Sequence, residues 1–441
     1  MGERGSARVG VTTVPDVSRR DLLKAGASGI AATLLSPILV RQALAAEDRF
    51  DPLPPISVQE RKARVAKAQA LMRKLGLGAL LLEPGSSMLY FTGIDWWRSE
   101  RLTAVVIPAE GEIGVVTPYF EEPSVRESLA FGDDVRTWNE DGNPLRLVRG
   151  ILSDRGTLER PLAVEQTVRY FVVSELKKLD SSIRTVSGAS VVLGCRMYKS
   201  DHELQLMQRA ADITVASLRA TYPQIAAGMT PDDVAGIMER ETTRLGGKPE
   251  FNLILLGEAS AYPHGSKKPQ LVTKGGVVLM DCGCSYQGYQ SDISRTFVHG
   301  EPTPKQRKLW DTVHRGQQLG FETAKPGTLA GHVDDVVRTY YESLGYGPGY
   351  KVPGTPHRLG HGIGMDGHEQ VNLVGGETTP LASGMCFSDE PGIYIPGEFG
   401  VRLEDCFHMT DKGPAWFSTP PPSIDDPFGQ SLKAMVPVPN R

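Results

Sequence analysis

The stretch VVLMDCGCSYQGYQSD, residues 277–292, joins an apolar run to two aspartates. Val277 to Met280 predict a buried β-strand that leads into Asp281, and a glycine-rich turn then carries the chain to Asp292. Burying a lone carboxylate costs several kcal/mol unless its charge is compensated. An arginine, a nest of backbone N–H groups or a metal ion could compensate it, and the rest of the chain must decide between them.

The bulk composition is that of a globular protein. The chain has 441 residues, of which 40% are hydrophobic and 23% charged, enough for two or three domains. A net charge of −4 excludes a broad basic surface for nucleic acid, and five cysteines exclude a disulfide scaffold. Prolines gather in residues 416–441, which we predict to be a loosely packed extension.

The start of the chain resembles an export signal. SRRDLLK, residues 18–24, precedes a modest apolar stretch and a small-x-small end at residues 43–45. The paired Arg19 and Arg20 resemble a twin-arginine signal. An amphipathic anchor or a transmembrane helix is the alternative, but the apolar stretch is short for spanning a bilayer. We therefore expect cleavage of residues 1–45, export to the periplasm or the extracellular space, and no stable membrane span afterwards.

Residues 50–195 predict an α/β domain. A capping box that starts at Ser57 begins a helix with apolar residues at helical spacing. ALLLE, residues 79–83, and SMLYFTG, residues 87–93, are predicted as strands. Residues 103–118 are predicted as a hairpin around a Glu-Gly turn. Helix and strand therefore alternate through this region.

Residues 200–415 contain a coarse internal duplication. Helices are predicted to begin near four capping or turn residues, which are Ser200, Thr230, Thr303 and Thr328. Two of them precede the pair Asp281 and Asp292, and two precede a second acid pair, Glu390 and Glu404. A duplicated helix pair with antiparallel strands is an α+β arrangement, and its two halves could bring four carboxylates into one cleft.

Between the two acid pairs lies PHRLGHGIGMDGHEQ, residues 356–370. It contains His357, His361 and His368, and its glycines allow the backbone to approach another group closely. A fourth histidine, His264, precedes the first acidic strand. Any one of these histidines could have a purely structural role. A functional interpretation therefore depends on their occurrence together.

Five of these residues resemble, in order and spacing, the metal ligands of the pita-bread metallopeptidases: Asp281, Asp292, His361, Glu390 and Glu404. That superfamily includes methionine aminopeptidase, aminopeptidase P, prolidase and the metal-free creatinase. The resemblance covers residues 200–410, and the earlier α/β region, with YFTG at residues 90–93, is similar to that of aminopeptidase P, prolidase and creatinase. It implies a C-terminal pita-bread domain preceded by a creatinase-like α/β N-terminal domain.

The resemblance and the residue chemistry together imply two divalent metal ions. Four carboxylates and one imidazole form a hard ligand set that suits Mn²⁺, with Co²⁺, Zn²⁺ or Fe²⁺ as alternatives. Four negative charges balance two such ions, so we expect these buried acids to need no arginine. By resemblance, Asp292 and Glu404 bridge the ions, Asp281 chelates one, and His361 with Glu390 holds the other.

Further residues match the non-ligand positions of the family. By resemblance, His264, His357 and His368 bind substrate, stabilise the oxyanion and protonate the leaving nitrogen. Glu390 would also transfer the proton of the attacking water. Arg402 would organise the acids or bind a substrate carboxylate, with a structural salt bridge as the alternative.

These expectations converge on hydrolysis of the Xaa-Pro bond in small peptides by a metal-activated water, as an Xaa-Pro aminopeptidase or dipeptidase. The alternatives are C–N hydrolysis or lyase chemistry on a small zwitterion, or a metal-free peptide-binding protein. QVN at residues 370–372 replaces the family's usual proline, so substrate preference stays open. A homodimer is implied, in which Trp96, Trp97 or Arg98 either reaches the partner's site or packs in the core.

The second acid pair also predicts a strand register. If Glu390 and Glu404 face each other on antiparallel strands, the numbers of paired residues should sum to about 794. Cys386 and Cys406 should then lie close together on the ligand-bearing face, and we expect free thiols there.

Overall fold

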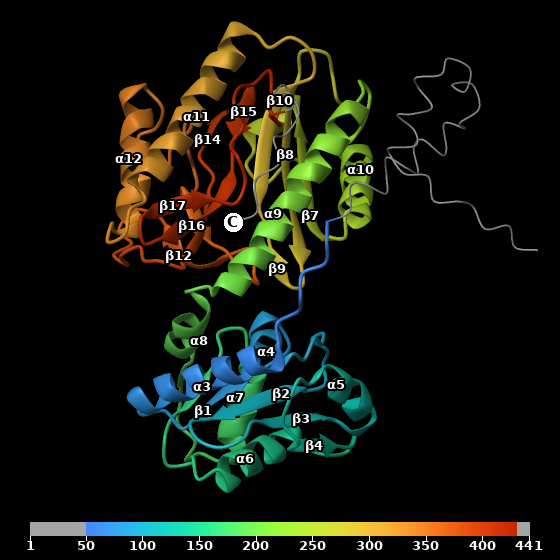
Figure 1. Cartoon of the computed structure of the whole chain (residues 1–441), viewed down its shortest axis with the longest axis vertical. Helices are drawn as coiled ribbons and strands as arrows, with labels where there is room; N and C mark the ends of the chain where they lie inside the picture. The colour runs from blue at the N-terminus through green and yellow to red at the C-terminus, as the bar shows by residue number, and fades with distance from the viewer. Residues whose placement is uncertain (1–49, 430–441) are drawn as a thin grey trace, which may run out of the picture. The chain divides into compact units, whose positions relative to one another are not determined.

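The computed structural model describes residues 50–429 (Figure 1). The predicted export signal, residues 1–45, and the last part of the proline-rich segment, residues 430–441, lie outside the described residues. Within residues 50–429, no helix has both the length and the apolar character needed to cross a membrane.

The N-terminal part is a mixed six-stranded sheet in the order β4-β3-β2-β1-β5-β6 (Figure 1). Its strands are β1 Ala79–Leu82, β2 Ala104–Pro108, β3 Gly114–Pro118, β4 Val135–Trp138, β5 Leu162–Val164 and β6 Thr185–Ser187. Its helices are α3 Val58–Lys74, α4 Ser86–Thr92, α5 Glu122–Ser128, α6 Pro144–Asp154, α7 Tyr170–Leu179 and α8 Ala189–Arg196, with a 3-10 turn at Tyr119–Glu121. The antiparallel pair β2–β3 confirms the predicted hairpin.

Both faces of the central strands β1, β2 and β3 are buried, as their apolar residues require. On β1, Leu80 and Leu82 pack into one hydrophobic cluster, whereas Ala79 and Leu81 pack into another. Successive side chains of a strand point to opposite faces, so each face has its own core. The α/β character predicted for this region is confirmed.

One predicted strand is wrong. SMLYFTG forms most of helix α4, not a strand, and Gly93 ends the helix in the left-handed region with φ of 84°. Met88, Tyr90 and Phe91 of this helix are buried. A short run of buried apolar residues fits a helix as well as a strand, and only the glycine that follows favoured a helix end.

The C-terminal part begins with a helix pair and a small antiparallel sheet in the order β10-β8-β7, with β9 beside β8. Its elements are α9 Asp201–Thr221, α10 Pro231–Arg244, β7 Lys248–Leu256, β8 Val277–Tyr286, β9 Tyr289–Gln290 and β10 Ile293–Val298, with 3-10 turns at Tyr222–Gln224 and Gly257–Ala261. Reciprocal capping boxes begin α9 at Ser200 and α10 at Thr230, as predicted.

The second half repeats this plan with a helix pair, a sheet in the order β12-β11-β13-β16-β17 and a hairpin β14-β15 (Figure 1). Its elements are α11 Pro304–Thr323, α12 Ala330–Ser343, β11 Gly360–Gly362, β12 Glu369–Leu373, β13 Cys386–Asp389, β14 Gly392–Ile395, β15 Phe399–Arg402, β16 Asp405–Thr410 and β17 Gly413–Trp416. Ser294 and Glu404 exchange both backbone hydrogen bonds, so the acid-bearing segments of the two halves lie side by side.

The predicted register of the second acid pair is confirmed. Strands β13 and β16 pair antiparallel from Cys386 opposite His408 to Asp389 opposite Asp405, and each pair of numbers sums to 794. All five cysteines are buried and free in the structure. The Cys406 thiol donates to the backbone oxygen of Asp292 at 3.2 Å, which places this cysteine beside the acid cluster.

The prediction of a loosely packed C-terminal extension is wrong for residues 420–429. Ile424 and Phe428 are buried, and the Phe428 ring lies 5.0 Å from that of Tyr222 and 5.7 Å from that of Phe297. A high proline content describes the backbone but says nothing of apolar anchors between the prolines, and these two side chains fix the segment.

Candidate metal centre

The five predicted metal ligands come from five different places in the C-terminal part. Asp281 lies within β8, His361 within β11, and Glu390 directly after β13. Asp292 lies between β9 and β10, and Glu404 between β15 and β16. Strand ends and the turns between them therefore supply most of the side chains, whereas Asp281 extends from the middle of β8, where it pairs with Leu253 and Ser294.

The structure brings these five residues together in overlapping groups. One group contains Asp281, Asp292 and Glu404, and a second contains His361, Glu390 and Glu404. Within each group the potential ligand atoms lie within 4.8 Å of one another. Glu404 belongs to both groups, so its carboxylate connects them. His368 forms a third group with Asp292 and His361, so its ring also lies at the edge of the cluster.

The ring of His361 is oriented by its backbone surroundings. Its Nδ1 donates to the carbonyl oxygen of Gly362 at 3.0 Å, which leaves Nε2 without a proton in the neutral ring. That Nε2 lies 3.3 Å from Glu390 and 3.7 Å from Asp292. Burial, and then the nearby His368, lower the pKa of His361 to about 3, so the ring is neutral and presents a lone pair to the acids.

The acids are crowded and deeply buried. Burial first, and then neighbouring carboxylates, raise the pKa values of Asp292 and Glu404 well above their usual range. Burial also raises the pKa of Glu390 to about 7, although Arg402 opposes this shift. Divalent cations would relieve this repulsion, because they bring positive charge to the point where the carboxylates converge.

Two buried oxygen atoms of the cluster also indicate that it can bind divalent cations. Asp281 Oδ1 and Glu404 Oε1 have no hydrogen-bond partner within residues 50–429. An unpartnered buried oxygen is costly, and a carboxylate oxygen is a preferred ligand of hard divalent ions. The donor set and its orphaned oxygens therefore fit a divalent metal centre.

The expectation that the acids need no arginine is wrong. The guanidinium of Arg402 pairs with Asp281 through Nη2 at 2.5 Å and donates through Nε to the Ser294 hydroxyl at 3.0 Å. The Ser294 hydroxyl in turn donates to Glu404 at 2.7 Å. Arg402 thus organises two of the acids, which favours that role over direct binding of a substrate carboxylate. One guanidinium offsets only one of four negative charges, so the need for further cations remains.

His357 is held inside the site and not at its surface. Its Nδ1 donates to the backbone oxygen of Arg358 at 2.8 Å, and its Nε2 accepts from the Tyr394 hydroxyl at 2.9 Å. The same hydroxyl accepts from Arg402 at 3.1 Å. Both ring nitrogens are therefore occupied, which favours a positioning role for His357. Sequence reasoning missed Tyr394 and Ser294, because neutral hydroxyls that bridge charged groups have no characteristic spacing.

His368 and His264 are the exposed members of the site. The His368 ring packs edge-on against His361 with centroids 4.2 Å apart. Burial lowers the pKa of His368, so the ring is neutral and can donate one N–H. His264 lies in an exposed turn, and Arg402 donates to the preceding carbonyl of Pro263 at 3.1 Å. Both histidines are thus accessible beside the acid cluster.

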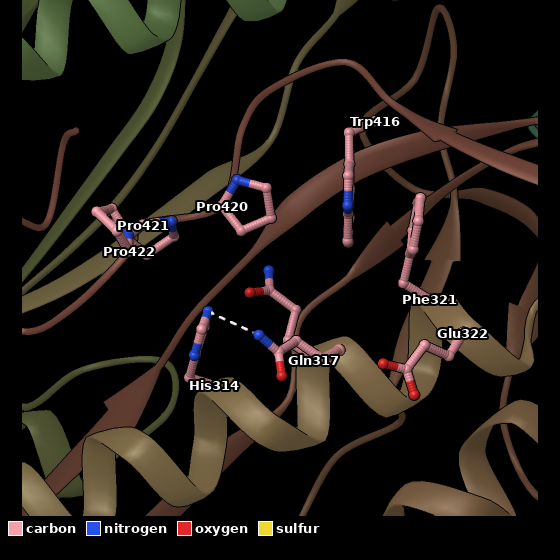
Figure 2. A pocket seen from close by; sticks show the side chains of 9 residues that line it. His314, Gln317, Phe321, Glu322, Trp416, Pro420, Pro421 and Pro422 are labelled. Atoms are coloured by element: carbon pink, nitrogen blue, oxygen red, sulfur yellow. Dashed lines mark hydrogen bonds between the residues drawn. The ribbon is translucent and has the colours of Figure 1, made fainter. Parts of the chain in front are cut away.

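A separate cavity of about 460 Å³ lies along α11 (Figure 2). It is lined by Phe321 and Trp416, whose rings are stacked 4.1 Å apart, by His314 and by residues 420–422. None of the predicted ligands lines it. This cavity is therefore distinct from the candidate metal centre.

The two tryptophans before Arg98 stack on each other with centroids 4.4 Å apart. Trp96 is partly buried against the core, whereas Trp97 is 63% exposed. Arg98 donates to the backbone oxygen of Pro84 and to the Thr167 hydroxyl, both at 3.0 Å. Core packing thus explains the position of Trp96, and local hydrogen bonds explain that of Arg98. Trp97 is the tryptophan whose side chain remains exposed.

Comparison with known proteins connects this geometry to a family. Residues 64–198 match the Creatinase/Prolidase N-terminal domain, and residues 205–411 match Metallopeptidase family M24. The putative dipeptidase YkvY of Bacillus subtilis is 30% identical, over 79% of this chain and 96% of its own length. The Xaa-Pro dipeptidase of Pyrococcus horikoshii is 34% identical, over 79% of this chain and 95% of its own.

A solved structure also shows similarity to a dipeptidase. The crystal structure of dipeptidase PepE from Mycobacterium ulcerans superposes with a TM-score of 0.76 at 30% identity, over 85% of this chain and 98% of that one. The chain therefore belongs to metallopeptidase family M24, with a creatinase-like N-terminal domain, and is a peptidase. The predicted pita-bread fold and the predicted peptidase class are both confirmed.

Proposed function

We propose that this peptidase hydrolyses the bond before proline in small peptides, as an Xaa-Pro dipeptidase or aminopeptidase. The observation that carries the proposal is the buried cluster of four carboxylates around the oriented ring of His361. Relatives of similar length named dipeptidase and Xaa-Pro dipeptidase support it and favour the dipeptidase form. Under the same proposal the chain is exported through its twin-arginine signal and acts as a homodimer.

The proposal includes two divalent ions, with Mn²⁺ as the first choice and Co²⁺, Zn²⁺ or Fe²⁺ as alternatives. They would be held by Asp281, Asp292, His361, Glu390 and Glu404. When bound, such ions lower the pKa of water and polarise a carbonyl group. The orphaned oxygens of Asp281 and Glu404 support this assignment.

The remaining chemistry belongs to the protein's own side chains. Glu390 accepts the proton of the attacking water and passes it to the proline nitrogen, which can leave only after protonation. The N–H of His368 donates to the oxyanion that develops on the substrate carbonyl, and His264 contacts substrate from its exposed turn. His357 and Arg402 hold this arrangement in place through the Tyr394 hydroxyl.

A substrate panel assayed with added Mn²⁺ tests the proposal. It contains Xaa-Pro dipeptides, Xaa-Pro-Yaa tripeptides, matched Xaa-Ala peptides, and small amidino and sulfonium compounds. We expect cleavage of the proline dipeptides, with Xaa-Ala peptides cleaved more slowly. Cleavage of non-proline dipeptides alone would contradict the Xaa-Pro preference. Turnover of only the amidino or sulfonium compounds would replace it with C–N hydrolysis or lyase chemistry.

A further inference from the structure

The loop that carries His368 is folded around one buried carboxylate. The Glu369 side chain is only 7% exposed, and its Oε1 accepts the backbone N–H groups of Met365 at 3.0 Å and Asp366 at 3.3 Å. A Cβ at Gly364 would lie 2.8 Å from this carboxylate, so a larger residue there would displace it. Residues 364–369 therefore close on Glu369, the residue next to His368.

Two cations from outside the loop hold this carboxylate. Arg196, the last residue of α8, donates through Nη2 to Glu369 at 2.6 Å and to Asp366 at 2.9 Å. Lys199 donates to the second oxygen of Glu369 at 3.0 Å. The side chains of Arg196 and Lys199 are 8% and 3% exposed. Two cations and two carboxylates thus form a charge-balanced quartet, in which Arg196, Lys199 and Glu369 are buried and Asp366 is half exposed.

The quartet is also tied to the N-terminal part of the chain. Arg196 donates through Nη1 to the hydroxyls of Ser86 at 2.8 Å and Ser87 at 2.9 Å. Ser86 in turn donates to Asp366 at 2.7 Å. The first turn of α4, which the sequence predicted as part of a strand, therefore supports the loop that carries a predicted catalytic histidine.

The quartet lies next to β11, the strand that contains His361. Glu369 pairs with Gly362 in the β11–β12 ladder, and Gly362 is the residue whose carbonyl orients His361. His368 stands directly before Glu369, and its ring packs against His361. A buried ion pair contributes little net stability compared with apolar side chains of the same volume, although removing one partner is costly, so its value here is in fixing one loop geometry. A displacement of Glu369 would move the His368 ring relative to the cluster.

We propose that Arg196 and Lys199 are positioning residues for His368, and that they set the place of its ring by clamping Glu369 and Asp366. This inference rests on the proposed role of His368 in the reaction. It predicts that removal of the clamp affects the chemical step through His368 and leaves the metal ligands loaded.

A double-mutant cycle between Arg196 and His368 tests the proposal. Arg196→Met should lower kcat by about 10- to 100-fold with little change in KM, because a small misplacement of a catalytic group has effects of this size. Arg196→Lys, which retains the charge, should recover part of the loss. In the His368→Ala background, Arg196→Met should cause no further loss of kcat. An equal loss in both backgrounds would overturn the proposal.

Arg64→Met is the matched control. Arg64 is 8% exposed, like Arg196, and its guanidinium pairs with the buried Glu203 at 3.2 Å and donates to Tyr90 and Tyr289 instead of to Glu369 and Asp366. The Arg64→Met variant should have a lower melting temperature than wild type but an unchanged kcat. A similar kcat loss in Arg64→Met would show that general destabilisation, and not the clamp, is responsible. If Arg196→Met does not fold, Lys199→Met is the milder variant for the same cycle, with a smaller expected loss.

Hydrogen exchange separates this proposal from the proposed function. Backbone exchange of residues 364–369 should rise in Arg196→Met and stay at the wild-type level in Arg64→Met, whatever substrate the enzyme cleaves. Unchanged exchange of this segment in Arg196→Met would overturn the clamp. A wild type that cleaves no Xaa-Pro peptide would overturn the proposed function, while the exchange result would still decide whether the loop is clamped.

Discussion

At the scale of single residues, Arg402 explains how four acids can converge before any cation binds. It pairs with Asp281 and reaches Glu404 through the Ser294 hydroxyl, so one guanidinium holds carboxylates from both halves of the domain. It is in turn held by Tyr394 and the carbonyl of Pro263. The cluster is thus preorganised by the protein, which reduces the reorganisation required when ligands bind.

The two neighbouring histidines, His361 and His368, should respond differently to truncation. His361→Ala should lose metal and activity together, because its oriented Nε2 faces the acids. His368→Ala should keep the metal and lower kcat by about 10²–10³-fold, the loss expected for one oxyanion donor. Metal analysis and peptide hydrolysis on both variants check this contrast, and a metal-free His368→Ala beside a loaded His361→Ala would reverse the two roles.

The sequence predicted which charged residues gather at the site but not how they are connected. The ligand set was predicted because acids and a histidine at family spacing form a rare pattern. Arg402 was expected either to organise the acids or to bind a substrate carboxylate, but a charge count alone could not say that it pairs with Asp281. Tyr394 and Ser294 were missed because each acts through one hydroxyl, and tyrosine and serine are common residues in any strand.

At the scale of secondary-structure elements, local signals predicted the boundaries well where a side chain caps the backbone. The capping boxes at Ser57, Ser200 and Thr303 begin helices as predicted. The β13–β16 register followed from one assumption, that Glu390 and Glu404 face each other. Helix α4 and the packed C-terminal segment were not predicted, because tertiary burial decides the state of short apolar runs.

The loop around Glu369 should make stability depend on pH. Burial would raise the pKa of the Glu369 carboxyl, but Lys199 and Arg196 lower it to about 2, below its ordinary value of 4.5. The ionised carboxylate therefore stabilises the fold above about pH 4.5, and this contribution is lost as the pH falls towards 2.

Glu369→Gln tests this dependence. The variant should unfold more easily than wild type at neutral pH, by an amount on the order of 3 kcal/mol, and the difference should shrink as the pH falls below about 4.5. Urea unfolding at a series of pH values measures both proteins. A stability difference that stays constant down to the acid limit of folding would contradict the assigned ion pairs.

At the scale of the whole molecule, the internal duplication of the C-terminal part is compatible with the proposed export of the folded chain. Two helix pairs, each followed by antiparallel strands, meet where Ser294 and Glu404 exchange backbone hydrogen bonds. The acids of each half are incomplete without the other, so the site forms only when the C-terminal part has folded. The twin-arginine route carries folded proteins, which is consistent with assembly of such a site before export.

The proposed export signal has its own test. Replacing both Arg19 and Arg20 with lysine keeps the charge but removes the paired arginines, so the unprocessed chain should accumulate in the cytoplasm. Arg41→Lys, a change in the same segment outside the pair, should leave export intact. Cell fractionation and intact mass measure location and cleavage, and export of the doubly substituted chain at the wild-type level would contradict the assignment.

The metal content of the Asp292→Asn variant shows whether the buried acid cluster holds metal ions. Wild-type protein equilibrated with Mn²⁺ and desalted should hold about two ions per chain, and Asp292→Asn should lose most of them. Asp334→Asn, which changes an equally buried aspartate paired with Arg338 outside the cluster, should keep the wild-type content. Elemental analysis that finds the same metal content in wild type and Asp292→Asn would contradict the account.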